Sequence, residues 1–265
     1  MEETKYENIL YEKNEKIAKI VLNRPAKLNT INRGMAIELK HALLDLEKDN
    51  NIKVGIITGS GEKAFSAGGD ISIFPELLKD ITAAYNWNKT GYDIHRFMER
   101  IEKPIIAAVN GYCLAGGLEI ALACDFIIAS DNASFGLAEI TIGLVPAWGG
   151  SIRLPRAIPA RRAKEMIYTG EPIDAQQAEK FGLVNKVVSL DQLNECVNEI
   201  AKKIADKSSL AIRVSKTIIN HGLETADIDT GLILERGAVG IFTAGSDSKE
   251  GVKAFLEKKS SKFKS

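Results

Sequence analysis

The sequence predicts an α/β fold in which helices cover a sheet, because predicted strands and helices alternate along its first half. Apolar, β-branched runs at residues 16–22, 54–58 and 105–109 are typical of strands. Residues 33–49 carry apolar side chains at helical spacing, and residues 85–101 also look helical. Strand, helix, strand, helix, strand is the order expected of a sheet covered by helices.

The second half of the chain is predicted to be mainly helical. A glycine-rich turn at 114–117 opens a helix that runs through Ala123, and an apolar strand-like run follows at 125–129. One further strand is expected near 183–188, and residues 190–258 form several amphipathic helices. The chain shows no internal repeat and no long linker.

Composition excludes several classes of function. The chain has 265 residues, 45% of them hydrophobic, and its 35 basic and 35 acidic residues cancel, so no general attraction to nucleic acid or membrane surfaces is expected. No secretory signal and no run of eighteen apolar residues is visible. Three cysteines without C-x-x-C spacing indicate reduced thiols, and we expect a cytoplasmic protein.

Two glycine turns are candidate binding sites for an oxyanion. One is Gly68-Gly69 within residues 67–70, and the other is Gly116-Gly117, directly before a helix. Glycine lets backbone N–H groups approach a ligand closely, and a helix start leaves its first N–H groups without partners. Either turn alone is more often an ordinary tight turn or cap.

Two glutamates are candidate acid–base groups. Glu119 lies in an otherwise apolar helix, and Glu139 follows Ala138 after a strand-like run. A buried acid is either functional or satisfied by a local bond, and Glu139 alone reads as an acid at a helix start. Twenty positions separate them, so only a fold that brings the two segments back together could make them a pair.

The motifs around these residues carry a family resemblance. Residues 63–71 (KAFSAGGDI), 104–119 (PIIAAVNGYCLAGGLE) and 135–146 (FGLAEITIGLVP) resemble the three signatures of the enoyl-CoA hydratase/isomerase (crotonase) superfamily. The stretches 23–25 and 168–184 also fit, so the resemblance covers nearly the whole chain in order. Gly69 stands where alanine is common, and Ala138 replaces a frequent proline.

The resemblance implies a fold and an assembly. The fold is a crotonase-type superhelix of strand–strand–helix turns with a C-terminal helical trimerisation region. Residues 1–190 would form the superhelical core with the acyl-CoA site, and residues 191–265 the helical oligomerisation region. The expected assembly is a homotrimer or a dimer of trimers.

The resemblance also implies site residues. The N–H groups of Gly69 and Gly116 would form the oxyanion hole. Trp148 would shape the acyl pocket, although simple packing explains a tryptophan there as well. The remaining substrate-binding candidates are Ala67, Asp70 and Ile71 near adenine and pantetheine, the loop residues Arg24, Ala26, Lys27 and Leu28 near the phosphates, and Phe255 and Lys258, which would complete a neighbour's site.

Family members that hydrate have glutamate at both acidic positions, so the resemblance implies reversible hydration of a 2-enoyl-CoA. Glu119 would activate water and Glu139 would exchange a proton at the α carbon. No metal and no separate cofactor are expected, because coenzyme A is part of the substrate. Two alternatives remain open, an enoyl-CoA isomerase of the same fold and a non-catalytic RNA-binding relative.

Other motifs are weaker. Residues 59–64 match a relaxed dinucleotide fingerprint, with Asp80 as a ribose acid, but the turn at 66–69 interrupts the helix that such a motif needs. Ser151 lacks the second glycine of a nucleophile elbow. His41, His95 and His221 have no ligand spacing and are interpreted as surface or packing residues.

Overall fold

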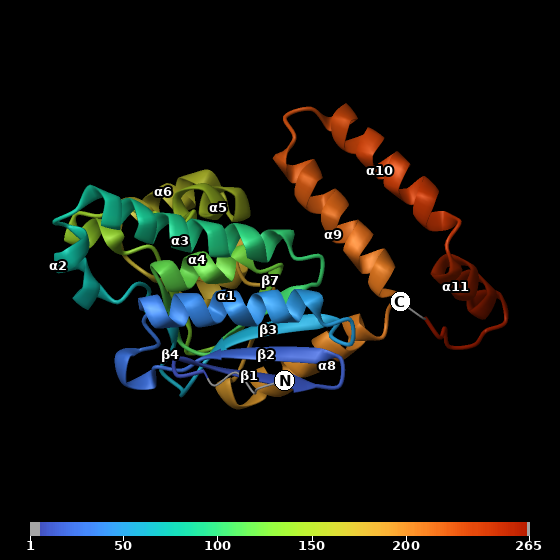
Figure 1. Ribbon diagram of the computed structural model, residues 1–265, viewed down its shortest axis with the longest axis horizontal. Coiled ribbons are helices and arrows are strands. Elements are labelled where there is room, and N and C mark those ends of the chain that lie inside the picture. Colours follow the sequence, from blue (N-terminus) through green and yellow to red (C-terminus); the bar gives the residue numbers. More distant parts are fainter. Residues whose placement is uncertain (1–5, 264–265) are drawn as a thin grey trace.

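The computed structural model describes residues 6–263, which form two sheets wound into a superhelix (Figure 1). The six-stranded sheet has the order β1-β2-β3-β5-β7-β10, and the four-stranded sheet has the order β4-β6-β8-β9. The strands are β1 (Ile9–Asn14), β2 (Ile17–Leu22), β3 (Val54–Gly59), β4 (Ala64–Ser66), β5 (Ile105–Val109), β6 (Tyr112–Leu114), β7 (Phe126–Ser130), β8 (Ser134–Gly136), β9 (Ile173–Asp174) and β10 (Lys186–Val188).

Each turn of the superhelix adds one strand to each sheet. The pairs β3 and β4, β5 and β6, and β7 and β8 follow one another along the chain, and a helical segment comes after each pair. The strands β3, β5 and β7 are neighbours and parallel in the large sheet, and β4, β6 and β8 are neighbours and parallel in the small one. This is the predicted crotonase-type spiral.

Helices cover both faces of the large sheet. The first core cluster unites α1, α3 and α4 with the sheet through residues such as Leu43, Met98 and Leu118. The second lies between the opposite face and α8, where Leu193 and Val197 meet Ile56 and Ile106. The helices are α1 (Arg33–Lys48), α2 (Phe74–Leu77), α3 (Ile81–Arg100), α4 (Gly116–Ala123), α5 (Gly150–Ala157), α6 (Ala160–Thr169), α7 (Ala175–Phe181), α8 (Leu190–Ala205), α9 (Ser209–Glu224), α10 (Ile228–Thr243) and α11 (Ser246–Leu256), with short 3-10 helices at Pro25–Lys27, Ile71–Ile73 and Glu139–Ile142.

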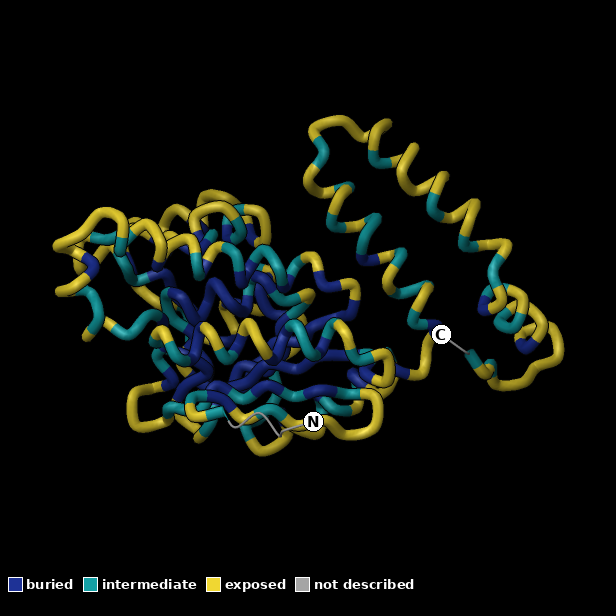
Figure 2. Tube along the Cα trace, viewed as in Figure 1, coloured by how far each residue is buried: buried dark blue, intermediate teal, exposed yellow. Residues whose placement is uncertain are grey.

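The last three helices extend away from this body (Figure 1). No residue of α10 is buried, and Figure 2 shows α10 in the exposed and intermediate colours along its length. The expected division after residue 190 coincides with the start of α8, which packs on the sheet, and the segment that extends from the body begins at α9. Within residues 6–263 no helix has the length and apolar character needed to cross a membrane.

The predicted long elements are present, with shifted ends. The helix expected at 85–101 begins at Ile81, where Asp80 caps it by accepting a hydrogen bond from the Thr82 amide at 2.8 Å. The strand expected near 183–188 covers only Lys186–Val188. The strands of the small sheet have two or three residues each, which is too short for a residue pattern to reveal.

Candidate active site

The candidate site lies at the carboxyl ends of the parallel strands of the small sheet. Because β4, β6 and β8 are parallel neighbours, the segments that follow their carboxyl ends lie side by side. These segments carry Gly69, Gly116 and Glu139, each two or three residues after a strand end. Three motifs from distant parts of the sequence are thereby brought to one place.

The two glycine turns are interlocked by close backbone contact. A Cβ on Gly68, whose φ is +95°, would lie 2.7 Å from Ala115 Cβ and 3.0 Å from Gly116 N. A Cβ on Gly117 would lie 2.2 Å from the Ser66 carbonyl oxygen. Gly68 and Gly117 therefore permit the approach of the two turns, a role that the sequence did not reveal.

The peptide planes set the direction of two N–H groups. The Gly68 carbonyl accepts a hydrogen bond from Ile31 N at 2.8 Å, so the Gly69 N–H in the same trans peptide points the opposite way. The Ala115 carbonyl accepts from Glu119 N at 3.1 Å along α4, so the Gly116 N–H points out of the helix start. Neither N–H has an acceptor among residues 6–263.

The Ala115 backbone is strained at this point. Its φ of 49° and ψ of −126° are rare for a residue with a side chain. The same residue donates its N–H to the Gly136 carbonyl at 2.8 Å, which ties β6 to β8. Strain of this kind is typical of functional sites, and here it orients the peptide that carries the Gly116 N–H.

Glu119 is buried and held by a loop. Its Oε1 accepts hydrogen bonds from Trp148 N and Gly150 N, each at 2.7 Å, and only 2% of the residue is exposed. Burial raises the pKa of this carboxyl, while the two amide bonds act in the opposite direction. Sequence reasoning missed these two amides, although the glycine pair Gly149-Gly150 at the start of α5 is of the kind that indicates a tight turn.

Glu139 lies close enough to Glu119 for their charges to interact. It begins the 3-10 helix Glu139–Ile142, and its Oε2 is buried without a hydrogen-bond partner among the described residues. Burial and, to a smaller extent, the charge of Glu119 raise the pKa of Glu139 to about 7. The fold therefore makes the two glutamates a pair in which burial raises both pKa values, and in which two amides hold Glu119 while Glu139 Oε2 has no partner among the described residues.

The raised pKa of Glu139 predicts a dependence of stability on pH. A carboxyl whose pKa is 4.5 when unfolded and about 7 when folded stabilises the fold fully below pH 4.5, and this contribution is lost as the pH rises through 7. We expect Glu139→Gln to gain unfolding temperature relative to the wild type between pH 4 and pH 8. Thermal melts at both pH values measure the change. The exposed Glu165→Gln is the control. The prediction would be contradicted if the difference in unfolding temperature between Glu139→Gln and the wild type were the same at pH 4 and pH 8.

Trp148 packs in the core and also borders the site. Its ring contacts Trp87 and His95, with ring centroids 5.2 Å and 5.6 Å away. A Cβ on Gly91 would lie 2.2 Å from the indole, and a Cβ on Gly116 would lie 2.8 Å from Trp148 Cζ3 and 3.5 Å from Gly69 N. The indole thus fills the space between α3 and the Gly116 turn.

The predicted coenzyme loop lies against the first glycine turn. Arg24 pairs with Asp70 at 2.9 Å and also donates to the Thr30 carbonyl, and the Leu28 carbonyl accepts a hydrogen bond from Ala67 N at 3.0 Å. Asp70 therefore neutralises part of the Arg24 charge within the protein. Hydrogen bonds from Ser72 and Arg24 lower the pKa of the Asp70 carboxyl.

The other predicted substrate-binding residues lie at the surface. Ala26, Lys27 and Ile71 are exposed beside this loop and turn. Phe255 is 83% exposed at the end of α11, and Lys258 follows it. In Figure 1, α11 lies at the far side of the molecule from α2, which follows the first glycine turn, so these two residues do not reach the site of their own chain.

The weaker motifs serve structural purposes. The 59–61 turn leads into strand β4 instead of a helix, which excludes the dinucleotide fold. Ser151 donates to the Pro146 carbonyl, His41 bonds to Tyr6, and His95 is buried against Trp148. Within residues 6–263 no cluster of three or more His, Cys, Asp or Glu side chains could hold a metal ion.

A ββα superhelix that brings two glycine turns and two glutamates together at the carboxyl ends of its small sheet has the architecture of the crotonase class. The family model for enoyl-CoA hydratase/isomerase matches residues 12–265. The chain belongs to this family.

Individual relatives are similar to this chain over nearly their whole length. A crotonyl-CoA hydratase of Syntrophomonas wolfei is 44% identical over 97% of this chain and 98% of its own. A short-chain-enoyl-CoA hydratase of Clostridium acetobutylicum is 40% identical over 95% of both chains. The crystal structure of an enoyl-CoA hydratase from Bacillus anthracis has a TM-score of 0.93 and 39% identity, and the match covers 97% of this chain and 99% of that one.

Proposed function

We propose that this protein is an enoyl-CoA hydratase that adds water reversibly to a short 2-enoyl-CoA. The observation that carries the proposal is the pairing of the Glu119 and Glu139 carboxyls beside the two unpaired amides of Gly69 and Gly116. The similarity to two relatives named as crotonyl-CoA and short-chain-enoyl-CoA hydratases supports it.

The proposed reaction begins with binding of the thioester carbonyl between the Gly69 and Gly116 N–H groups. Glu119 takes a proton from water, and the water oxygen bonds to the β carbon. The electrons of the carbon–carbon double bond move toward the carbonyl and form an enolate, whose oxygen the two amides stabilise. The α carbon then takes a proton from Glu139, which gives a 3-hydroxyacyl-CoA. The proton that Glu119 took from water passes to Glu139 or to solvent, and Glu139 is reprotonated before the next turnover.

The environments of the two glutamates support this division of roles. Burial raises the pKa of Glu119, and its two amide hydrogen bonds oppose this rise by favouring the ionised form, which suits a base. The pKa of Glu139 is about 7, so a large fraction carries a proton near neutral pH, which suits a proton donor. Two carboxyls with different environments provide the acid and the base.

Turnover of a panel of enoyl-CoA thioesters tests the function. We expect crotonyl-CoA to lose its double-bond absorbance fastest and longer chains to react more slowly, because the Trp148 indole fills the space next to Gly116. Product analysis separates hydration from double-bond migration. Conversion of 3-enoyl thioesters without any hydration would favour the isomerase alternative, and no turnover of any thioester would refute an enoyl-CoA enzyme.

We also propose that the chain assembles as a homotrimer or a dimer of trimers through α9–α11. The apolar residues Ile228 and Ile241 of α10 are 76% and 82% exposed, and such surfaces in a single chain indicate an interface between subunits. In this assembly Phe255 and Lys258 would lie at a neighbour's coenzyme site. Light scattering should give three or six times the 28.9 kDa chain mass, and a monomer would contradict the proposal.

Coenzyme A enters as part of the substrate, and the proposal includes no separate cofactor. Arg24, Ala26, Lys27, Leu28, Ala67, Asp70 and Ile71 would line its path, with Lys27 as an exposed cation for the phosphates. A cytoplasmic location completes the proposal, and the free thiols of Cys113, Cys124 and Cys196 are compatible with a reducing compartment.

A further inference from the structure

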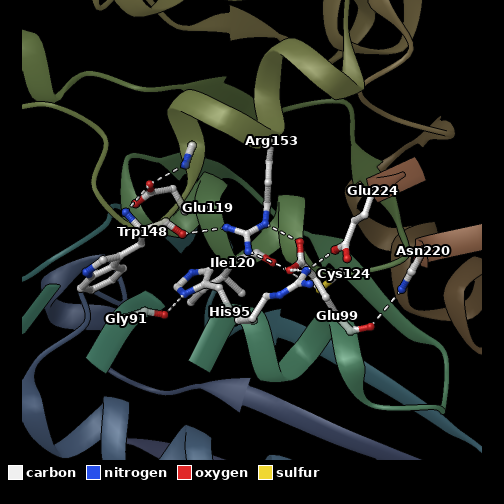
Figure 3. Close-up of polar contacts among 12 residues, drawn as sticks. Gly91, His95, Glu99, Glu119, Ile120, Cys124, Trp148, Arg153, Asn220 and Glu224 are labelled. Carbon is white, nitrogen blue, oxygen red and sulfur yellow. Dashed lines mark hydrogen bonds and ion pairs between the residues drawn. The ribbon is translucent and has the colours of Figure 1, made fainter. Parts of the chain in front are cut away.

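A network of charged side chains lies directly behind the loop that holds Glu119 (Figure 3). At its centre is Arg153 of α5, whose Nε and Nη2 donate to the two carboxylate oxygens of Glu99 at 2.6 Å and 3.0 Å. Its third nitrogen, Nη1, donates to the Trp148 carbonyl at 2.8 Å. A bidentate pair of this kind fixes the guanidinium plane.

Arg153 holds the same loop that holds Glu119. The Trp148 carbonyl accepts from Arg153, and the Trp148 N–H donates to Glu119 Oε1. A Cβ on Gly149, whose φ is +109°, would lie 1.8 Å from Arg153 Nη1, so the guanidinium occupies the space that a side chain there would need. Residues 148–150 are therefore clamped between Arg153 on one side and Glu119 on the other.

We propose that Arg153 is a positioning residue for Glu119, and that α9 braces it through Glu99. This inference rests on the proposed function, because it gives Glu119 a defined orientation toward water. Arg153 itself contacts Glu99 and the Trp148 carbonyl and has no role in contacting the substrate. It acts through the Trp148 and Gly150 amides.

The brace comes from the helix that starts the extended C-terminal segment. Arg96 of α3 pairs with Glu99 at 2.9 Å and also contacts Glu224 near the end of α9. Asn220 of α9 donates to the Glu99 carbonyl at 2.9 Å. The position of α9 is thereby linked to the carboxylate that orients Arg153. Figure 3 shows this series of contacts from α9 through Glu99 and Arg153 to the loop that holds Glu119.

The charges around Glu119 determine what removal of Arg153 should do. Glu139 interacts with it from the 3-10 helix and Arg153 from α5, while α3 contributes Glu99, which pairs with Arg153, and His95, which packs on Trp148. The positive charge of Arg153 lowers the pKa of Glu119, against the larger effect of burial. His95 is buried with a pKa of about 4, so it is neutral near neutral pH and adds no charge.

The test compares Arg153→Gln, Arg153→Lys and the exposed control Arg162→Gln in crotonyl-CoA hydration across pH. We expect Arg153→Gln to lower kcat by about tenfold to a hundredfold with KM little changed, because a small misplacement of a catalytic group costs that much. The acid limb of its pH profile should move to higher pH, since Glu119 loses a nearby positive charge. Arg153→Lys should keep the limb in place and recover part of kcat, and Arg162→Gln should match the wild type.

A second variant tests the brace and guards against a folding defect. Glu224→Gln removes only the contact to Arg96, and we expect a loss of kcat smaller than that of Arg153→Gln, with unchanged KM. If Arg153→Gln does not fold by circular dichroism, Glu99→Gln takes its place with the same expected change in kcat.

Two results would overturn the inference while the wild type still hydrates crotonyl-CoA. One is a kcat of Arg153→Gln within twofold of the wild type with an unshifted pH profile. The other is an effect on KM alone. Absence of wild-type hydration would instead refute the proposed function, so the two failures are distinguishable.

Discussion

Replacing either glutamate by glutamine is expected to reduce hydration of crotonyl-CoA by about 10²–10⁴-fold, the usual contribution of a general acid or base. Glu119→Gln removes the group that accepts the proton of water, and its amide keeps an oxygen for the Trp148 and Gly150 N–H groups. Glu139→Gln removes the proton donor at the α carbon. Steady-state kinetics on both variants, folded by circular dichroism, measure the losses.

The same two variants separate hydration from isomerisation. A hydratase needs both carboxyls, so both variants should lose hydration to a similar extent. An isomerase moves one proton along the acyl chain and should depend mainly on one glutamate. Full hydration activity in either variant would remove that glutamate from the mechanism, and the exposed Glu165→Gln serves as the control for a general charge effect.

Removal of the Gly69 N–H is expected to cost about 10²–10³-fold in kcat, the effect of losing one oxyanion donor. Gly69→Pro removes this N–H and also restricts the backbone at 68–69, but it leaves the neighbouring bridge to Ile31, which uses the Gly68 carbonyl and the Asp70 N–H. The matched control is Gly69→Ala, which keeps the N–H and has room, because the nearest atom to its Cβ is Phe74 Cε2 at 3.8 Å. The kcat of each variant on crotonyl-CoA measures the effect.

The comparison of proline with alanine makes the outcome specific. Alanine at this position should leave kcat within a fewfold of the wild type. Equal losses in the two variants would show that the side chain and not the missing donor is responsible, and equal activities would show that the Gly69 amide does not bind the carbonyl. Retained binding of coenzyme A in both variants would show that the turn is intact.

Much of the fold could be predicted from local patterns. The strands β2, β3, β5 and β7 are apolar runs whose composition alone identifies them, and α1 has helical periodicity. The short strands β4 and β6 could not be recognised, because three residues do not establish a period, whereas the run that contains β8 was recognised as strand-like. The strands β4 and β6 form only by pairing with segments far away in the sequence, as Ala64 pairs with Tyr112 and Tyr112 with Ser134, so no local pattern marks them.

The candidate site divides in the same way. Gly69, Gly116, Glu119 and Glu139 were recognised from glycine turns, an acid in an apolar helix and the family resemblance. The contribution of Arg153 could not be recognised, because an arginine in an amphipathic helix has no local mark. Its partners Glu99 and Trp148 lie in other elements and meet it only in the folded chain.

The sequence by itself determined which chemical groups this protein has and what each local segment can form: glycine turns that free backbone amides, and acids next to apolar runs. The tertiary structure decided which groups meet and how they ionise. Parallel pairing of β4, β6 and β8 places Glu119 near Glu139, and burial raises the pKa of Glu139 to about 7. Burial depends on every segment packed around a group, so no single segment of sequence encodes it.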